Sequence, residues 1–154
     1  MDEKKVATNR AARRDYHILE TYEAGIELAG TEVKSLRASK ANLKEGFARI
    51  EGGQVFLYNM HISPYEFGNI ANVDPKRVRR LLFHKSQIKK LIGQTSIKGF
   101  TLIPLSAYIK RGRVKIELAL ARGKRSFDKR ETIKKREADL EVRRAVRRNA
   151  KNGG

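Results

Sequence analysis

The segment from Arg122 to Gly154 sets the strongest limit on what this chain can fold into. It contains thirteen Lys or Arg against five Asp or Glu, and so carries +8 of the chain's net charge of +18. Its apolar residues are too sparse to form a core, and such a segment is instead suited to lie along a polyanion. We therefore expect a folded body at 15–123, preceded by a mobile basic arm at 1–14 and followed by a basic tail at 124–154.

The charge favours a nucleic acid as the partner. The sequence pI is about 10.5, and an acidic membrane surface or an acidic protein is the less favoured alternative. No stretch is long and apolar enough to span a bilayer, and the chain has no cysteine for a disulfide or a thiolate metal site. These features are compatible with a reducing compartment, and we expect a cytoplasmic protein.

Alternating polarity and glycine turns predict a fold that is mainly β. The Gly52-Gly53 pair separates two apolar runs and indicates a hairpin. A second hairpin is expected between 100–110 and 113–121, around Arg111-Gly112, because apolar and polar residues alternate through the second of these runs. Five or six short antiparallel strands with one or two small helices suggest a small barrel or sandwich.

Two short helices are expected within this body. Residues 31–39 place apolar side chains on one helical face, and Thr31 is a suitable N-cap. Residues 86–92 form the second helix, which Ser86 can cap and Gly93 can end.

The region between these helices has two interpretations. Asp74-Pro75 resembles the start of a helix. Residues 79–84 equally fit a short buried strand, and periodicity alone does not decide between helix and strand.

Catalysis finds no support in the residue pattern. The three histidines are widely separated, and no phosphate-binding glycine loop or nucleophile motif is present. Glu20, Glu23 and Glu27 are more simply solvent-facing charges than an acid–base pair. We expect a binding protein without catalytic residues, metal or cofactor.

The tail has local helix signals although it lacks a buried face. Asp128 and Glu131 have the spacing of a capping box, and acidic residues precede basic ones by four positions at two places. Isolated helices are marginal in water. The tail is therefore expected to be disordered when free and helical when bound.

Several long segments together resemble the small protein B (SmpB) family. They are YEAGIELAGTEVKSLRASKANLKEGFARI, DPKRVRRLLFHKSQIKKLIG, GFTLIPLSAYIKRGRVKIELALARGK and FDKRETIKKRE, preceded by Asn9-Arg10-Ala11 and Asp15-Tyr16. The resemblance runs from about Asn9 into the tail. It implies an antiparallel barrel of the oligonucleotide-binding (OB) type, flanked by two or three short helices.

The resemblance also implies a function in bacterial trans-translation. Members of this family bind the tRNA-like domain of tmRNA as monomers and deliver it to stalled ribosomes. There the barrel stands in for the missing anticodon stem, and the basic tail enters the empty mRNA channel near the decoding centre. The implied partners are tmRNA and ribosomal RNA, with no membrane and no cofactor.

Residue by residue, the resemblance assigns two sets of contacts. The residues expected to bind tmRNA are Asn9, Arg13, Glu23, Leu82 and Arg113. The residues expected to contact the ribosome are Lys124, Arg125, Phe127, Asp128, Lys129, Arg130, Ile133, Lys134 and Arg136. The tail reads IKKRE where members often read IKERE, so Lys135 adds a positive charge.

Simpler interpretations stand beside these assignments. From its sequence alone, Leu82 is a core leucine and Glu23 is a surface strand residue. Phe127 either stacks on a base or folds back onto the barrel. For the whole chain, the alternatives are a structural ribosomal protein and a general RNA-binding OB-fold protein.

Overall fold

Two hairpins with left-handed turn residues build most of the sheet, as the sequence predicts. The computed structural model describes residues 3–68 and 72–124. Strands β4 (Phe47–Glu51) and β5 (Gln54–Tyr58) are joined by Gly52 and Gly53, whose φ angles are 57° and 76°. Strands β8 (Phe100–Lys110) and β9 (Arg113–Gly123) are joined by Arg111 and Gly112, with φ angles of 51° and 76°. Paired positive φ angles of this kind match the twist of the flanking strands.

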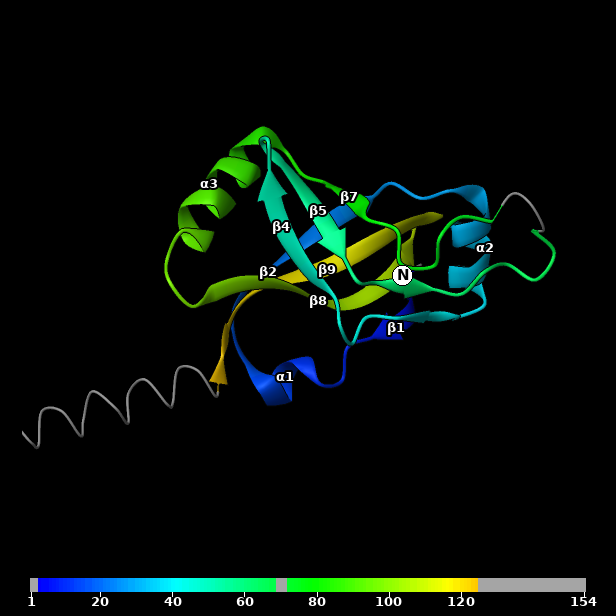
Figure 1. Cartoon of the computed structure of the whole chain (residues 1–154), viewed down its shortest axis with the longest axis horizontal. Coiled ribbons are helices and arrows are strands. Elements are labelled where there is room, and N and C mark those ends of the chain that lie inside the picture. Colours follow the sequence, from blue (N-terminus) through cyan, green and yellow to red (C-terminus); the bar gives the residue numbers. More distant parts are fainter. Residues whose placement is uncertain (1–2, 69–71, 125–154) are drawn as a thin grey trace, which may run out of the picture.

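The strands close into an antiparallel barrel (Figure 1). Strand β2 (Tyr16–Ile26) pairs with β9 and with β7 (Arg79–Leu82); β7 pairs with β5, β4 with β8, and β8 with β9. Strand β1 (Glu3–Thr8) extends the sheet beside β8. Two short strands, β3 (Ala41–Asn42) and β6 (His61–Ile62), form a separate pair. The expected mainly β barrel is confirmed.

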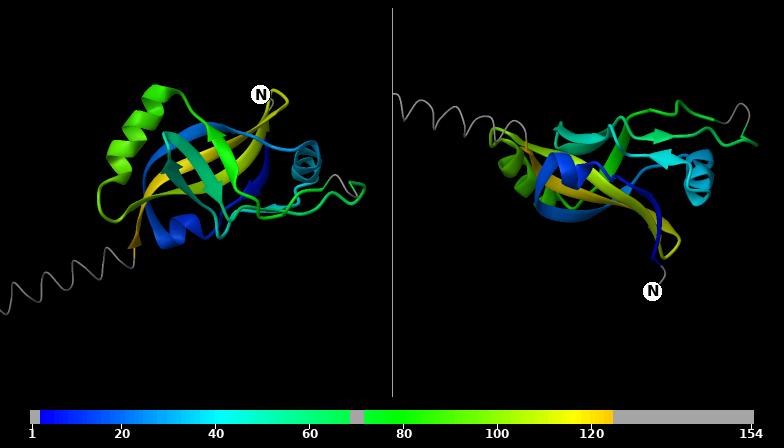
Figure 2. Two further views of the ribbon diagram at one scale, coloured as in Figure 1. Left: turned by 45° about the horizontal axis from the view of Figure 1, so that its top comes forward. Right: turned by 90° about the horizontal axis from the view of Figure 1, so that it is seen from below.

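Three short helices flank the barrel in the described part of the chain. They are α1 (Ala12–Asp15), α2 (Gly30–Arg37) and α3 (Lys85–Thr95). Helices α2 and α3 lie at opposite ends of the barrel (Figures 1 and 2). None of the helices within residues 3–68 and 72–124 is long and apolar enough to cross a membrane.

The core fills the barrel because each strand turns alternate residues inward. Val55 and Leu57 of β5 and Leu118 of β9 are fully buried there. Leu36 of α2 and Leu91 of α3 pack into the same cluster. A second, smaller cluster forms on the outer side of β8, where α1 covers Ile103 and Leu105 with Ala12.

The structure corrects the expected mobile arm at 1–14. Residues 3–8 form β1, whose register with β8 runs from Glu3–Lys110 to Thr8–Ser106. Val6 is buried in the main core, so β1 belongs to the sheet. The folded body therefore begins well before the expected position 15.

The helix boundaries also differ from the sequence expectations. Helix α2 begins before Thr31, and Glu32 accepts the N–H of the N-cap residue Ala29 at 2.9 Å. Ser86 and Gly93 both lie inside α3. In both α2 and α3, the side chain at the third helical position accepts the backbone N–H of the N-cap residue. In α3, Gln87 accepts the N–H of His84 at 3.1 Å.

The ambiguous region resolves into a strand. Residues 79–82 form β7, and Asp74-Pro75 begins a turn rather than a helix. The deciding contact is long-range, since β7 pairs on both sides, with β5 and β2.

A buried ion pair attaches β7 to α2. Arg79 is 0% exposed and donates to Glu32 through Nε at 2.5 Å, while its Nη1 donates to the Met60 carbonyl at 2.7 Å. Arg77 donates to the other oxygen of Glu32 at 2.5 Å. Burial alone raises the pKa of Glu32, but the Ala29 amide, Arg77 and Arg79 outweigh it and hold this pKa below its ordinary value.

Candidate nucleic-acid interface

The outer face of the barrel brings together three of the five residues assigned to RNA contact. Gly25 of β2 is paired with Leu82 of β7 on one side and with Lys115 of β9 on the other. Because outward residues recur every second position, Glu23 shares this face with Gly25, and Arg113 shares it with Lys115. We call this surface the β2–β9 face. It is defined by Glu23, Gly25, Leu82, Tyr108, Lys110, Arg113 and Lys115.

Leu82 is an exposed leucine rather than a core residue. It is 46% exposed, whereas its neighbour Leu81 is 2% exposed. A Cβ on Gly25 would meet the Leu82 Cβ at 3.3 Å, so the glycine lets this side chain lie close over β2. Leu82 also lines an open cavity of about 290 Å³ together with Phe83 and Ile88. An apolar side chain in this position can pack on an unstacked base.

Glu23 is held in place by two donors. The buried Tyr108 hydroxyl donates to its Oε2, and Lys110 Nζ lies 3.3 Å from the same oxygen. The hydrogen bond from Tyr108 lowers the pKa of Glu23, and Lys110 and Lys115 lower it further, against partial desolvation. Burial and then the Glu23 carboxylate raise the pKa of Tyr108, so the phenol stays protonated as a donor. The result is an ionised, oriented acceptor, which suits an amino group on a base edge.

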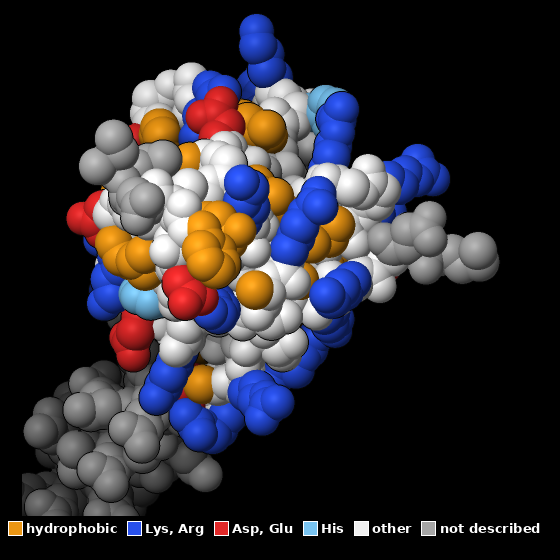
Figure 3. All heavy atoms as spheres, turned by 90° about the vertical axis from the view of Figure 1, so that its right-hand side faces the viewer, with side chains coloured by type: hydrophobic (Ala, Val, Ile, Leu, Met, Phe, Trp, Pro, Cys, Tyr) orange, Lys and Arg blue, Asp and Glu red, His pale blue; other side chains and the backbone are white. Residues whose placement is uncertain are grey.

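Basic side chains surround this carboxylate. Lys110 and Arg113 pair across the β8–β9 hairpin, and Lys115 follows on the same side of β9. Lys and Arg also surround exposed hydrophobic side chains on the face that carries α2 (Figure 3). A second carboxylate, Glu117, is the cross-strand partner of Glu23 and accepts from Ser106 Oγ at 3.3 Å. The cations of this face can provide phosphate contacts for affinity, and the fixed carboxylates can provide directional contacts for base choice.

Arg13 lies away from this cluster. It belongs to α1, next to Tyr16, which pairs with Gly123 at the far end of β9 from Arg113. Eleven residues of β9 separate the two ends, a span of about 33 Å in an extended strand. Lys124 Nζ donates to the Arg13 carbonyl at 3.0 Å, so Arg13 sits where the tail begins.

Asn9 is a positioning residue in this structure. It is 7% exposed, its Nδ2 donates to the Pro104 carbonyl at 3.0 Å and the Leu43 carbonyl at 3.4 Å, and its N–H donates to Leu105 at 2.7 Å. These bonds fix the turn between β1 and α1. Asn9 is therefore held in the wall of an open cavity of about 330 Å³, and its expected contact with RNA stays a prediction.

Most of the expected ribosome contacts lie outside the described residues. Lys124 is described, and the others in the set, from Arg125 to Arg136, are not. The sequence did not single out Tyr108, Lys110 or Lys115. The alternation in β9 places Lys115 on the outer face, but the hydrogen bond from Tyr108 to Glu23 spans β8 to β2 and has no local signal.

No metal centre is formed within the parts of the chain that the structure describes. No three His, Asp or Glu side chains there are grouped to hold an ion. What these residues offer chemically is hydrogen bonding, charge and stacking, which is the chemistry of a binding surface.

Comparisons with known proteins agree with this interpretation. The family model described as SmpB protein matches residues 6–148. The SsrA-binding protein of Caldicellulosiruptor saccharolyticus is 63% identical over 146 residues, covering 95% of this chain and 92% of that protein. The SsrA-binding protein of Enterococcus faecalis is 56% identical over 146 residues, covering 95% of each. A solved structure named "tmRNA-SmpB: a journey to the center of the bacterial ribosome" aligns with a TM-score of 0.66 and 57% identity, over 76% of this chain and 82% of that one.

Proposed function

The chain belongs to the SmpB protein family, and from that premise we propose that it binds the tRNA-like domain of tmRNA as a non-enzymatic factor in ribosome rescue. Relatives with more than half of their residues identical are named SsrA-binding proteins. The observation that carries the proposal is the fixed Glu23 carboxylate beside exposed Leu82, among the cations of the β2–β9 face.

This arrangement supports recognition of folded RNA rather than of charge alone. Cations bind phosphates without regard to sequence. A carboxylate repels phosphates, so its place among these cations is useful only where a base edge supplies a donor. Leu82 adds an apolar surface on which an unstacked base can rest.

We propose a division of labour between the body and the tail. The β2–β9 face holds the tRNA-like domain, while the basic segment after Lys124 contacts ribosomal RNA in the empty mRNA channel near the decoding centre. The tail's excess of Lys and Arg supports this role, since such a segment binds along a polyanion. Arg13 and Lys124 mark the junction between the two parts.

Glu23→Gln and Leu82→Ala are expected to weaken binding to the tRNA-like domain by about tenfold or more each, because a well-placed base contact contributes about 1–3 kcal/mol. Glu23 and Leu82 are 43% and 46% exposed and lie outside the barrel core, so the circular-dichroism spectrum is expected to stay unchanged. The measurement is a titration of labelled tRNA-like domain at fixed salt. Arg37→Gln is the matched control, since it removes an exposed charge from α2. Unchanged affinity in both test variants, or equal affinity of the unmodified chain for unstructured RNA, would contradict the proposal.

Tyr108→Phe is expected to lower the same affinity by about tenfold or more by releasing the Glu23 carboxylate from its donor, since a hydrogen bond to a charged group contributes about 1.5–3 kcal/mol. In a Glu23→Ala background, which offers the Tyr108 hydroxyl no acceptor at this position, the change should have almost no further effect. The measurement is the double-mutant cycle. Equal losses in both backgrounds would show that Tyr108 acts through packing and not through Glu23.

A further inference from the structure

The open cavity of about 330 Å³ beside α1 lies next to the point where the chain leaves the barrel. Tyr16 lines this cavity and is the cross-strand partner of Gly123, the last residue of β9. Lys124 Nζ then donates to the Arg13 carbonyl of α1 at 3.0 Å, so the first residue after β9 is held against α1. We call this hollow the α1 cavity. It is defined by Ala11, Tyr16, Glu45, Phe47, Arg49 and Ile103.

Part of the wall of the α1 cavity is apolar and held in place. Phe47 is stacked on Tyr58 of the neighbouring strand, with ring centroids 5.2 Å apart and an interplanar angle of 7°. The Arg49 guanidinium lies 5.2 Å from the Phe47 centroid. Tyr16 and the buried Ile103 belong to the smaller core cluster and add apolar surface to the same cavity. An aromatic ring that enters this cavity buries apolar surface and gains ring contacts, both of which are favourable.

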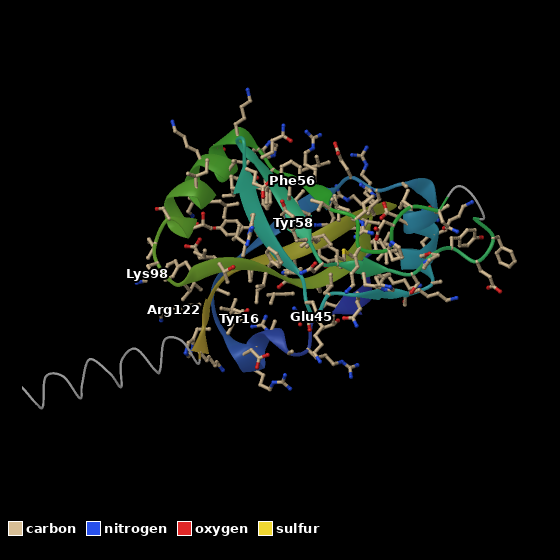
Figure 4. All side chains as sticks on the ribbon, viewed as in Figure 1. Tyr16, Glu45, Phe56, Tyr58, Lys98 and Arg122 are labelled. Carbon is tan, nitrogen blue, oxygen red and sulfur yellow. The ribbon has the colours of Figure 1, made fainter. Side chains whose placement is uncertain are left out.

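Charges of both signs complete the lining of the α1 cavity. Asp15 and Glu45 are exposed carboxylates, and Lys44 and Arg49 are exposed cations. Tyr16 and Glu45 lie on the side of the barrel that carries α1 (Figure 4). The cavity is therefore suited to an aromatic side chain that is flanked, along its own chain, by charges of both signs.

The segment at 125–128, which lies outside the described residues, has this composition. It reads Arg-Ser-Phe-Asp, and Phe127 is the first large apolar residue after Lys124. Phe127 is three positions beyond Lys124, a reach of about 10 Å in an extended chain. The rim residue Tyr16 lies within this reach, because it is paired with Gly123. So short a covalent link also gives the segment a high effective concentration at the cavity.

We propose that the α1 cavity is an intramolecular docking site, which holds the segment at 125–128 when no ribosome is bound. The Phe127 ring occupies the apolar part of the cavity, while Arg125 faces Glu45 and Asp128 faces Arg49. A docked ring is closed to other contacts. On the proposed function, the segment therefore has to leave the cavity before the tail contacts ribosomal RNA, and docking acts as an autoinhibitory contact.

The test uses the free full-length protein, without RNA. The chain contains no tryptophan, so Phe127→Trp introduces a single indole whose fluorescence reports its own surroundings. Acrylamide is expected to quench this indole about threefold less strongly than the one in an Ala150→Trp variant, because pockets bury about 70–90% of a ligand's surface. Adding Glu45→Lys is expected to raise the quenching in the Phe127→Trp chain towards the Ala150→Trp value. Glu66→Lys, the same change next to Tyr65 and Lys34 of α2, is expected to leave it unchanged.

A second measurement keeps the natural side chain at position 127. Amide resonances of Tyr16, Phe47 and Thr101, which line the α1 cavity, are expected to differ between the isotope-labelled unmodified chain and its Phe127→Ala variant. Equal quenching in the two tryptophan variants would overturn the inference, and so would resonance changes that spare these three residues. Both measurements are made without RNA, so their failure would leave the proposed function standing. Failure of the unmodified chain to bind the tRNA-like domain would count against that function alone.

Discussion

A chain that ends at Lys124 is expected to bind the tRNA-like domain within about tenfold of the full-length affinity and to lose peptide tagging on stalled ribosomes entirely. All the residues of the β2–β9 face and its supporting strands remain in this variant. The truncation removes eleven Lys or Arg and five Asp or Glu, so the salt dependence of RNA binding should flatten. The measurements are a salt-series titration of the tRNA-like domain and a tagging assay on ribosomes stalled at a broken mRNA.

A scrambled tail of the same composition is the matched control for this truncation. It keeps the charge, and so should restore the salt dependence of RNA binding. It removes the capping-box spacing of Asp128 and Glu131, and should still fail in tagging. Loss of binding to the tRNA-like domain on truncation would place tmRNA recognition in the tail. Restored tagging by the scrambled tail would show that charge alone is sufficient.

Local signals were enough to predict the hairpins of the barrel. Gly52-Gly53 and Arg111-Gly112 occupy turns with positive φ, and the alternation in β9 places Ile116 and Leu118 in the core. Strand β1 was missed because its sequence has a single core residue, Val6, and because its partner β8 lies about a hundred residues away. Pairing over that separation leaves no periodic pattern in a short polar segment.

The candidate site, like the fold, could be predicted from the sequence only in part. The family resemblance pointed to Glu23 and Leu82, and the structure brings them onto one face. Residue type alone predicts a buried leucine and an exposed asparagine, yet Leu82 is exposed and Asn9 is buried. Both outcomes depend on neighbours from other strands: Gly25 beneath Leu82, and the carbonyl of Pro104 that binds Asn9.

The Arg79→Met variant is expected to lose about 3–5 kcal/mol of unfolding free energy, the usual cost of removing one partner of a buried ion pair. Arg79 is fully buried and bonds Glu32, the Met60 carbonyl and the Pro75 carbonyl, at 2.5, 2.7 and 3.0 Å. Without it, Glu32 is left 3% exposed with a charge that only Arg77 balances. The measurement is urea unfolding followed by far-ultraviolet circular dichroism, with the m-value checked for a change of mechanism.

The pH dependence of stability provides a second readout of the same pair. The folded-state pKa of Glu32 lies below its ordinary value of 4.5. Its contribution to stability is therefore fully present above the unfolded-state pKa and is lost as the pH falls through the folded-state pKa. Arg79→Met raises the folded-state pKa towards or above the ordinary value, so the acid-sensitive part of the unfolding free energy should shrink or reverse in sign.

Arg80→Met is the matched control, because it removes the same side chain one position along β7. Arg80 points to the outer face and pairs with Glu27, where the two side chains are 37% and 50% exposed. Exposed pairs contribute about 0–1 kcal/mol, so this variant should unfold close to the unmodified protein. Equal losses of unfolding free energy for Arg79→Met and Arg80→Met would show that the effect does not depend on the buried ion pair. A small loss of unfolding free energy for Arg79→Met would contradict this prediction, because it would show that Glu32 can be buried without Arg79 at little cost.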